Sequence, residues 1–275
     1  MIWPTLPVPT RRLDGETLAS YSARAAARNH TTVERVEQIL REQNLLPDHP
    51  RSRRAPIIRE AWRQLGRLDQ MAFEEPSEVW GEYVTERRMC NLCAGGENVT
   101  ARLPRIGLVC ARHRRWLGTP QQSIEHLPDV VHAETVFRRH LVPKAVMFDS
   151  AVVSLARECA AVAATTAMLA RHDDVAVALC PETVRFAILL TDTAFLRRGM
   201  QAVLEGAPLQ QRVVAPEVAK IISEDEFADR WRAEVRICDY LAYLTSCLID
   251  MKPDGRGMDK YNALRFLMLQ FTEDG

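Results

Sequence analysis

The chain has 275 residues, of which 47% are hydrophobic and 26% are charged, and its 36 basic side chains are balanced by 36 acidic ones. This composition is that of a globular protein and excludes a long disordered tail. Apolar runs stay well short of the roughly 18 residues that a membrane span needs, and the first residues show no signal peptide, so we expect no membrane partner.

The neutral total hides a difference between two parts of the chain. Residues 1–144 hold 22 basic and 17 acidic side chains, a balance of +5, and the remainder has the opposite balance of −5. The seven cysteines are an odd number and lack the regular spacing of a disulfide framework. Thiols that stay reduced are typical of a reducing compartment, and we therefore expect a cytoplasmic protein.

Two short helices are expected after a proline-rich arm at the N-terminus. Asp14 can cap a helix over residues 15–28. Thr31 and Glu34 then form a capping box for a second helix with an apolar face. The sequence therefore predicts a helical N-terminal part.

These two helices have two interpretations. Short helices joined by a tight turn are typical of a helix-turn-helix, which reads DNA with its second helix. The second helix, however, is expected to expose Glu34, Glu37 and Glu42, which suit a major-groove face poorly. The other interpretation is a packing scaffold. A third helix is expected to begin at Pro56.

An acidic stretch over residues 74–86 follows the third helix. Its aromatic and aliphatic residues recur at helical spacing, and we assign them to the core: Val79, Trp80 and Tyr83.

Four potential metal ligands come next, in two pairs. Cys90 and Cys93 form one pair and Cys110 and His113 the other, in the pattern C-x2-C-x16-C-x2-H. Two residues between ligands allow a tight turn to direct both side chains at one ion, and two such pairs complete a tetrahedral structural site without an open position for substrate. The sequence therefore predicts one structural Zn²⁺ ion.

The residues between the two pairs predict a small finger over residues 87–118. Gly95 and Gly96 accept a positive φ behind the first pair. Residues 100–103 and 106–109 are expected to form two strands of a β-ribbon. Cys110 and His113 then lie on one face of a helical turn. The expected finger is a zinc-bound β-ribbon of treble-clef-like form.

Arginine is concentrated in this finger, where a single acidic residue, Glu97, accompanies it. Arginine binds phosphate with two parallel hydrogen bonds, so the finger is a candidate surface for nucleic acid. The alternatives are a solvated face and pairing with the acidic part of the same chain. The candidate residues are Arg87, Arg88, Arg102, Arg105, Arg112, Arg114 and Arg115.

Two segments of the chain resemble the TniQ family. The finger holds Arg88-Met89-Cys90 to Cys93 and then Cys110-Ala-Arg-His113-Arg-Arg-Trp-Leu117, which is similar to the family's R-x-C-x2-C and C-x2-H ahead of a basic helix ending in W-L. The N-terminal stretch Gly15-Glu16-Thr17-Leu18-Ala19-Ser20-Tyr21, with Arg24 and Asn29, resembles the family's E-S-L-x-S-W-L-x-R pattern. The resemblance covers about residues 4–120.

The resemblance implies a role as a target-selection adaptor in DNA transposition. Such a protein reads DNA or docks on a nucleoprotein targeting complex and recruits other transposition proteins. The chain departs from the family in two respects: Asn91-Leu92 lacks the common proline, and no second C-x2-C follows His113. The second departure favours an alternative function, a zinc-containing DNA-binding regulator or a phage or mobile-element protein without transposition partners.

The rest of the chain predicts a helical bundle. We place a domain boundary between residues 1–142 and residues 143–275, and expect helices over 145–171, 181–205, 216–222, 226–251 and 258–271. Because this part is acidic and its helices carry more apolar residues than one narrow stripe, we expect a protein-interaction domain, in the simplest form a homodimer. The alternative is a single large bundle in which such a helix is buried on two sides. The whole chain is expected to be mainly α.

Signals of catalysis are weak. The chain has no phosphate-binding glycine loop and no G-x-S-x-G, so we do not expect an enzyme. Cys180, at the predicted start of a helix, is the best nucleophile candidate, but a buried cysteine is the preferred interpretation there and for Cys159, Cys238 and Cys247. His126, His132 and His140 are spaced unsuitably for one metal site.

Overall fold

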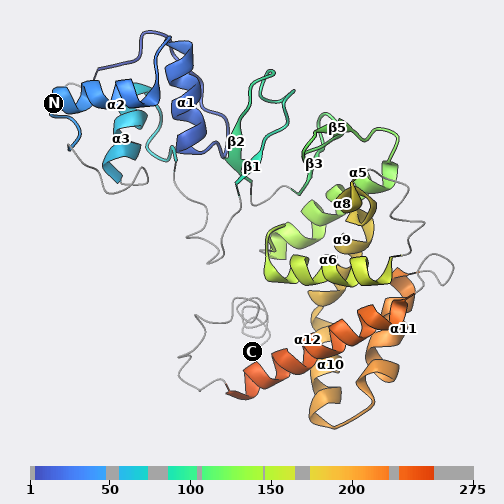
Figure 1. Ribbon diagram of the computed structural model, residues 1–275. Coiled ribbons are helices and arrows are strands. Elements are labelled where there is room, and N and C mark those ends of the chain that lie inside the picture. The colour runs from blue at the N-terminus through green and yellow to red at the C-terminus, as the bar shows by residue number, and fades with distance from the viewer. Residues whose placement is uncertain are drawn as a thin grey trace. The chain divides into compact units, whose positions relative to one another are not determined.

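The fold was described from a computed structural model that covers the chain (Figure 1). The residues described are 4–47, 56–73, 86–103, 107–144, 146–164, 174–222 and 229–250, the last with side chains to residue 247. Helices predominate, so the expectation of a mainly α protein is confirmed. The stretch over 74–85, Arg105 and the helix expected over 258–271 lie outside the described residues.

The chain divides into two compact units. The first contains α1 (Leu18–Arg28), α2 (Val33–Glu42), α3 (Pro56–Leu65), β1 (Glu86–Arg88) and β2 (Thr100–Arg102). The second contains β3 (Val109–Cys110), β4 (Arg115–Trp116), β5 (Gln122–Ser123), α5 (Pro128–Val136), η1 (Phe137–Leu141), η2 (Val142–Lys144), α6 (Ala151–Ala163), α8 (Val175–Ala178), α9 (Cys180–Leu190), α10 (Thr193–Leu204), η3 (Gln210–Val214), α11 (Ala215–Ile221) and α12 (Arg230–Asp250).

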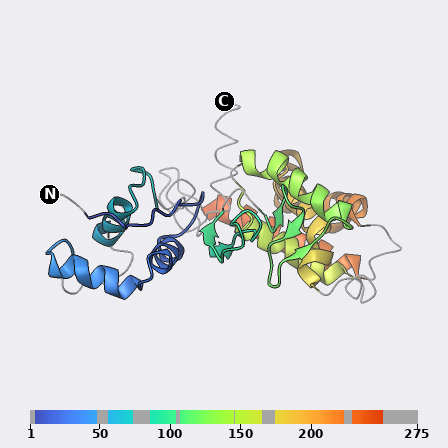
Figure 2. The same ribbon diagram turned by 90° about the horizontal axis from the view of Figure 1, so that it is seen from above.

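The helices of the first unit surround a core of their own. In Figure 2, α1 is seen nearly end-on and α2 from the side, so the two helices lie crosswise. The largest side chains of this core are fully buried: Tyr21, Leu40, Ile58 and Trp62. Helix α3 begins at Pro56 as predicted, because proline fits the first turn, where its missing N–H has no partner to lose.

Both predicted caps of α1 and α2 were wrong in position. The side chain of Thr17, and not Asp14, caps α1, and Thr32, and not Thr31, caps α2. The backbone before α1 is held in an extended form because Glu16 pairs with Ala101 of β2, so helical geometry begins only after Thr17. Asn29 ends α1 as expected.

Glu37 is buried, which corrects the expectation that α2 exposes it. Its side chain accepts hydrogen bonds from Nε1 of Trp62 at 3.4 Å and from Arg41 at 3.3 Å. The carboxylate of Glu37 is thus buried with two hydrogen-bond donors and stabilises the packing of α2 on α3. It does not lie on the exposed face of α2.

Strand β2 confirms the first predicted strand, but the expected β-ribbon was wrong in its pairing. Strand β2 pairs in antiparallel fashion with β1, in the register Glu86↔Arg102, and β3 pairs with β4. The loop after β1 brings the chain back alongside β1, so β2 has a partner that the sequence pattern did not indicate.

A three-stranded sheet replaces the helical turn expected at Cys110 and His113. Strand β4 lies between β3 and β5, and residues 111–114 form the turn between β3 and β4. Trp116 lies opposite Val109 in this pairing, and both side chains are buried in the core of the second unit. Burying a tryptophan from β4 against the helices favours the hairpin over a helical turn.

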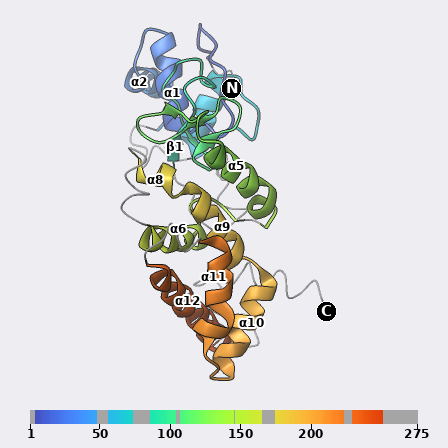
Figure 3. The ribbon, with the colours of Figure 1, turned by 90° about the vertical axis from the view of Figure 1, so that its right-hand side faces the viewer.

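The second unit is a helical assembly with one hydrophobic core. Helix α6 packs against α9 and α12, and α12 also packs against α10 and α11 (Figure 3). The core extends from the β3–β4 hairpin through Phe137, Phe186 and Phe195 to α12. Residues before and after 142 therefore share one core.

Helix α5 begins at Pro128, a residue that suits the first turn of a helix. One predicted feature of this helical part needed correction. The helix expected over 181–205 is two helices, because Asp192 caps α10 while the hydroxyl of Thr191 bonds back to the carbonyl of Ala187 at 2.8 Å. Such local side-chain bonds compete with the helical backbone. Among the described helices, none combines the length and the apolar character that crossing a bilayer requires.

Candidate metal centre

The first ligand pair lies in a tight loop after β1. The carbonyl of Cys90 accepts from the N–H of Ala94 at 3.0 Å, and Gly95 and Gly96 have the predicted positive φ, +64° and +89°. A Cβ at either glycine would have no atom within 4 Å, so a larger side chain would fit there. Glycine is favoured at both positions because of the positive φ angle. Cys90 is buried, whereas Cys93 reaches the surface.

The second pair lies at the end of the β3–β4 hairpin. Cys110 is the last residue of β3 and is buried, and His113 lies in the turn that follows. Trp116 in β4 anchors the hairpin to the second unit, because its Nε1 donates to Asp174 at 2.7 Å. The hairpin therefore positions Cys110 and His113 without a helix.

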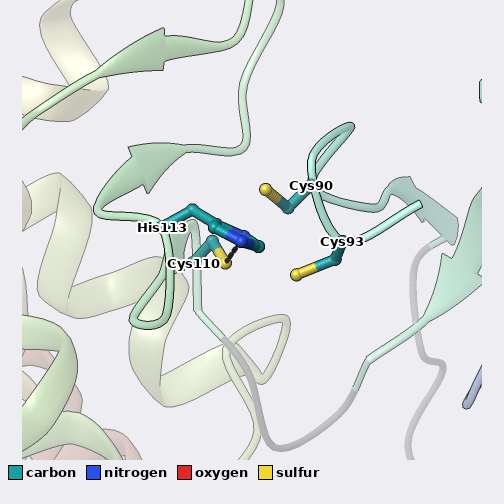
Figure 4. Close-up of side chains that lie close together, drawn as sticks. All are labelled: Cys90, Cys93, Cys110 and His113. Carbon is teal, nitrogen blue, oxygen red and sulfur yellow. Dashed lines mark hydrogen bonds between the residues drawn. The ribbon is translucent and has the colours of Figure 1, made fainter. Parts of the chain in front are cut away.

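The four side chains point toward one centre (Figure 4). Their ligand atoms all lie within 4.8 Å of one another, and Sγ of Cys110 lies 3.7 Å from Nδ1 of His113. With metal–sulfur and metal–nitrogen bonds of about 2.3 and 2.0 Å, a tetrahedral zinc site places sulfur and nitrogen about 3.5 Å apart. The described geometry therefore fits a metal ion held by three thiolates and one imidazole.

The chemistry of this donor set also fits. Thiolate and imidazole ligands select zinc and similar soft or borderline ions over calcium or magnesium. The cluster offers four protein ligands, which is the number that a closed tetrahedral site takes. Among the described residues, no second group of three or more such side chains comes together.

The arginines of the finger fall into two groups. Arg88, Arg112 and Arg114 are exposed, and none of them has an ion pair within the described residues. The others are partly buried: Arg102 pairs with Glu86 at 3.1 Å and Arg87 donates to the carbonyl of Leu103 at 3.0 Å, while Arg115 lies in β4. Arg105 lies outside the described residues.

Glu97, the single acidic residue among these arginines, is engaged by α1. Its carboxylate pairs with Arg24 and with Arg28, the latter at 2.7 Å. Burial tends to raise the pKa of Glu97, but the hydrogen bonds from both arginines outweigh it and lower the pKa. The charge of Glu97 is therefore directed at α1.

The N-terminal residues of the TniQ-like pattern form one buried network. Glu16 is 1% exposed and accepts from Nε of Arg24 at 2.8 Å and from the hydroxyl of Ser20 at 3.1 Å. That hydroxyl oxygen in turn accepts from the N–H of Thr100 in β2 at 3.0 Å. The pattern joins α1 to β2, beside the first ligand pair in the chain.

Two further residues of the pattern hold the N-terminal arm. The hydroxyl of Tyr21 donates to the carbonyl of Thr10 at 3.2 Å. The side chain of Asn29 accepts from the N–H of Val8 at 2.8 Å and donates to the carbonyl of the same residue at 3.0 Å. Five residues of the pattern thus have structural roles in the first unit: Glu16, Ser20, Tyr21, Arg24 and Asn29.

Cysteines outside the cluster are buried or partly buried. Cys180 lies at the start of α9, where the positive end of the helix dipole by itself would lower the pKa of a thiol. Burial, together with the charges of Glu134 and Glu182, instead raises the pKa of its thiol to about 12. Burial also raises the pKa of Cys159 to about 12. Both read as core residues, as the sequence predicted.

One residue beside the cluster had no signal in the sequence. The side chain of Gln121 bonds to the backbone at Met89 and Asn91, about 30 residues earlier in the chain. A glutamine after a proline carries no motif, and its backbone partners have no sequence signature.

Comparison of the chain with protein-family models, with curated proteins and with solved structures gives no match.

Proposed function

We propose that the chain is a TniQ-like zinc-binding adaptor that selects targets in DNA transposition, contacting DNA or a nucleoprotein targeting complex. One observation carries this proposal: the C-x2-C and C-x2-H pairs that carry the resemblance come together in one cluster, with their ligand atoms within 4.8 Å of one another. The N-terminal part of the pattern supports it, because its residues form one connected network.

The proposed ion is zinc, and its role is structural. When bound, zinc supplies folding free energy on the order of 10 kcal/mol by joining ligands that are far apart in sequence. The ligands are Cys90, Cys93, Cys110 and His113. Elsewhere in the first unit, the crossed helices α1 and α2 serve as a scaffold, since Glu37 is used in packing on α3.

The proposed contacts with DNA run through exposed arginines of the finger. Arg88, Arg112 and Arg114 have no ion pair within the described residues, so their charge is available to phosphate. Arg87 and Arg102 are used by the β1–β2 hairpin. We therefore assign phosphate contact first to the exposed three and only second to the others.

Fluorescence anisotropy with labelled duplex DNA tests this assignment. Wild-type protein should bind with an affinity that falls steeply with salt, and the Arg112→Ala/Arg114→Ala variant should bind more weakly, with a salt slope reduced by about one unit for each lost contact. The Arg185→Ala/Arg232→Ala variant removes the same charge from exposed arginines of the helical part and should bind as wild type. Equal binding by all three proteins would exclude the finger as the DNA surface.

A second candidate function is a zinc-containing DNA-binding regulator, or a phage or mobile-element protein, without transposition partners. It is favoured by the later cysteines, since Cys159 and Cys180 are core residues and the described part of the chain holds no second metal-binding group. If genes for a transposase and an ATPase lie beside this one, co-purification of their products with this protein separates the two functions. A stable complex supports the adaptor, and DNA binding without any such complex supports the regulator.

A further inference from the structure

The first ligand pair is held by a side chain that is not a ligand. Oε1 of Gln121 accepts a hydrogen bond from the backbone N–H of Asn91 at 3.0 Å, and Nε2 of Gln121 donates to the backbone carbonyl of Met89 at 2.6 Å. Met89 and Asn91 are the two neighbours of Cys90. One amide group thus fixes the backbone on both sides of a metal ligand.

The orientation of this amide is dictated by its partners. A backbone N–H can only donate and a backbone carbonyl can only accept, so the oxygen of Gln121 must face Asn91 and its nitrogen must face Met89. The amide of Gln121 therefore makes both hydrogen bonds at the same time, as the backbone of a neighbouring β-strand would. A shorter or an apolar side chain at this position cannot reproduce the pair.

The backbone polar groups of Met89 and Asn91 are divided between the loop and Gln121. The N–H of Met89 bonds to the carbonyl of Val99 at 2.8 Å, and the N–H of Gly96 bonds to the carbonyl of Asn91 at 2.8 Å. The carbonyl of Met89 and the N–H of Asn91 bond to Gln121. Both peptide neighbours of Cys90 are therefore held by hydrogen bonds from two sides.

We propose that Gln121 is a positioning residue of the metal centre, which preorganises the Cys90 loop and thereby strengthens metal binding. The inference rests on the proposed zinc site. Its physical basis is that a loop already in its bound form loses less conformational freedom when the ion binds. Outer groups that orient metal ligands typically change metal affinity by about 10- to 100-fold when they are removed.

Competition for Zn²⁺ with a chromophoric chelator measures this effect on the full chain. Gln121→Ala should weaken zinc binding about tenfold. Gln121→Glu keeps an acceptor for the N–H of Asn91 but sets a carboxylate against the carbonyl of Met89, so it should also weaken binding. Gln122→Ala is the matched control, because the neighbouring glutamine makes no side-chain hydrogen bond within the described residues and should leave the affinity unchanged.

A second measurement separates positioning from general support of the fold. The melting temperature of the chelator-treated variants should stay near that of chelator-treated wild type, while the stabilisation gained on adding zinc should be smaller for both Gln121 variants. If Gln121→Ala does not fold, Gln121→Glu decides by the same criteria. The inference is wrong if wild type and Gln121 variants hold zinc equally tightly, or if Gln122→Ala loses as much affinity. Wild type that binds no zinc overturns the metal centre itself and not only the role of Gln121.

Discussion

Nε of Arg24 donates a hydrogen bond to Oε1 of Glu16 over 2.8 Å, and the carboxylate of Glu16 is fully buried. Both residues belong to the TniQ-like pattern, and Arg24 also pairs with Glu97 in the loop that follows the first ligand pair. This ion network joins α1 to the chain around the metal centre.

Replacing Arg24 by alanine should destabilise the protein strongly. The variant leaves Glu16 buried without its cation, and breaking a buried pair in this way costs about 3 kcal/mol or more. Arg28→Ala is the matched control, since the Arg28 side chain is 46% exposed and its pair with Glu97 should contribute less than about 1 kcal/mol. Urea denaturation of both variants gives the two values. Equal losses would mean that burial of Glu16 does not govern the network.

Glu60 on α3 provides a test of pH dependence. Hydrogen bonds from Arg63 and then Gln64 lower the pKa of Glu60 from 4.5 to about 2. A lowered pKa stabilises the folded state above the unfolded pKa, and this stabilisation is lost as the pH falls from about 4.5 through 2. Because the side chain is 44% exposed, the contribution should stay below about 1 kcal/mol. An NMR titration of the Glu60 carboxyl should show a low midpoint that rises in Arg63→Ala; an unchanged midpoint contradicts the assignment.

Gly199 allows α10 to approach α12 closely. A Cβ at this position would lie 2.6 Å from Cδ1 of Leu241, whose side chain is fully buried. Gly199→Ala gains about 1 kcal/mol of helix propensity but overpacks the core at a cost of about 1–3 kcal/mol, so a net loss of stability is expected. Leu241→Ala removes the obstructing atoms, and thermal denaturation of the double-mutant cycle should show that Gly199→Ala then becomes neutral or stabilising. Additive effects would contradict the steric account.

The homodimer expected from the sequence has a candidate surface on α12. Trp231, Val235 and Tyr243 are large apolar side chains that are 56%, 37% and 51% exposed. Light scattering of the full chain should give a dimer, and Trp231→Glu with Tyr243→Glu should give a monomer, because charge on this surface opposes apolar contact. Leu204→Glu, on the exposed end of α10, is the control and should remain dimeric. A wild-type monomer at all concentrations removes the dimer.

Substitutions are preferable to truncation for that experiment. The sequence suggested a boundary after residue 142, but Val130, Phe137 and Leu141 pack in the same core as α9 and α12. Cutting the chain there would expose this core.

Local signals in the sequence predicted helices and ligands well. The four members of the Cys/His cluster were predicted from spacing alone, because C-x2-C and C-x2-H require only a tight turn at each pair. The start of α3 at Pro56 and the end of α1 at Asn29 follow from the conformational preferences of those two residues. Features set by one or two neighbouring residues are therefore accessible from sequence.

Features that depend on partners far away in the sequence were not predicted. The N-cap moved from Asp14 to Thr17 because Glu16 pairs with Ala101, and the segment at Cys110 became a hairpin because Trp116 is buried against the helices. Gln121 acts through backbone groups about 30 residues away. None of these contacts leaves a periodicity or a motif in the chain.

Zinc content is the most direct test of the account. Elemental analysis of full-length protein prepared without chelator should give one zinc ion per chain, since the four ligands complete one tetrahedral site. Cys93→Ser should lose that ion and leave the loop after β1 unstructured, whereas Cys238→Ser, outside the cluster, should retain it. Absence of stoichiometric zinc from the wild type, or full retention of zinc by Cys93→Ser, would contradict the metal centre.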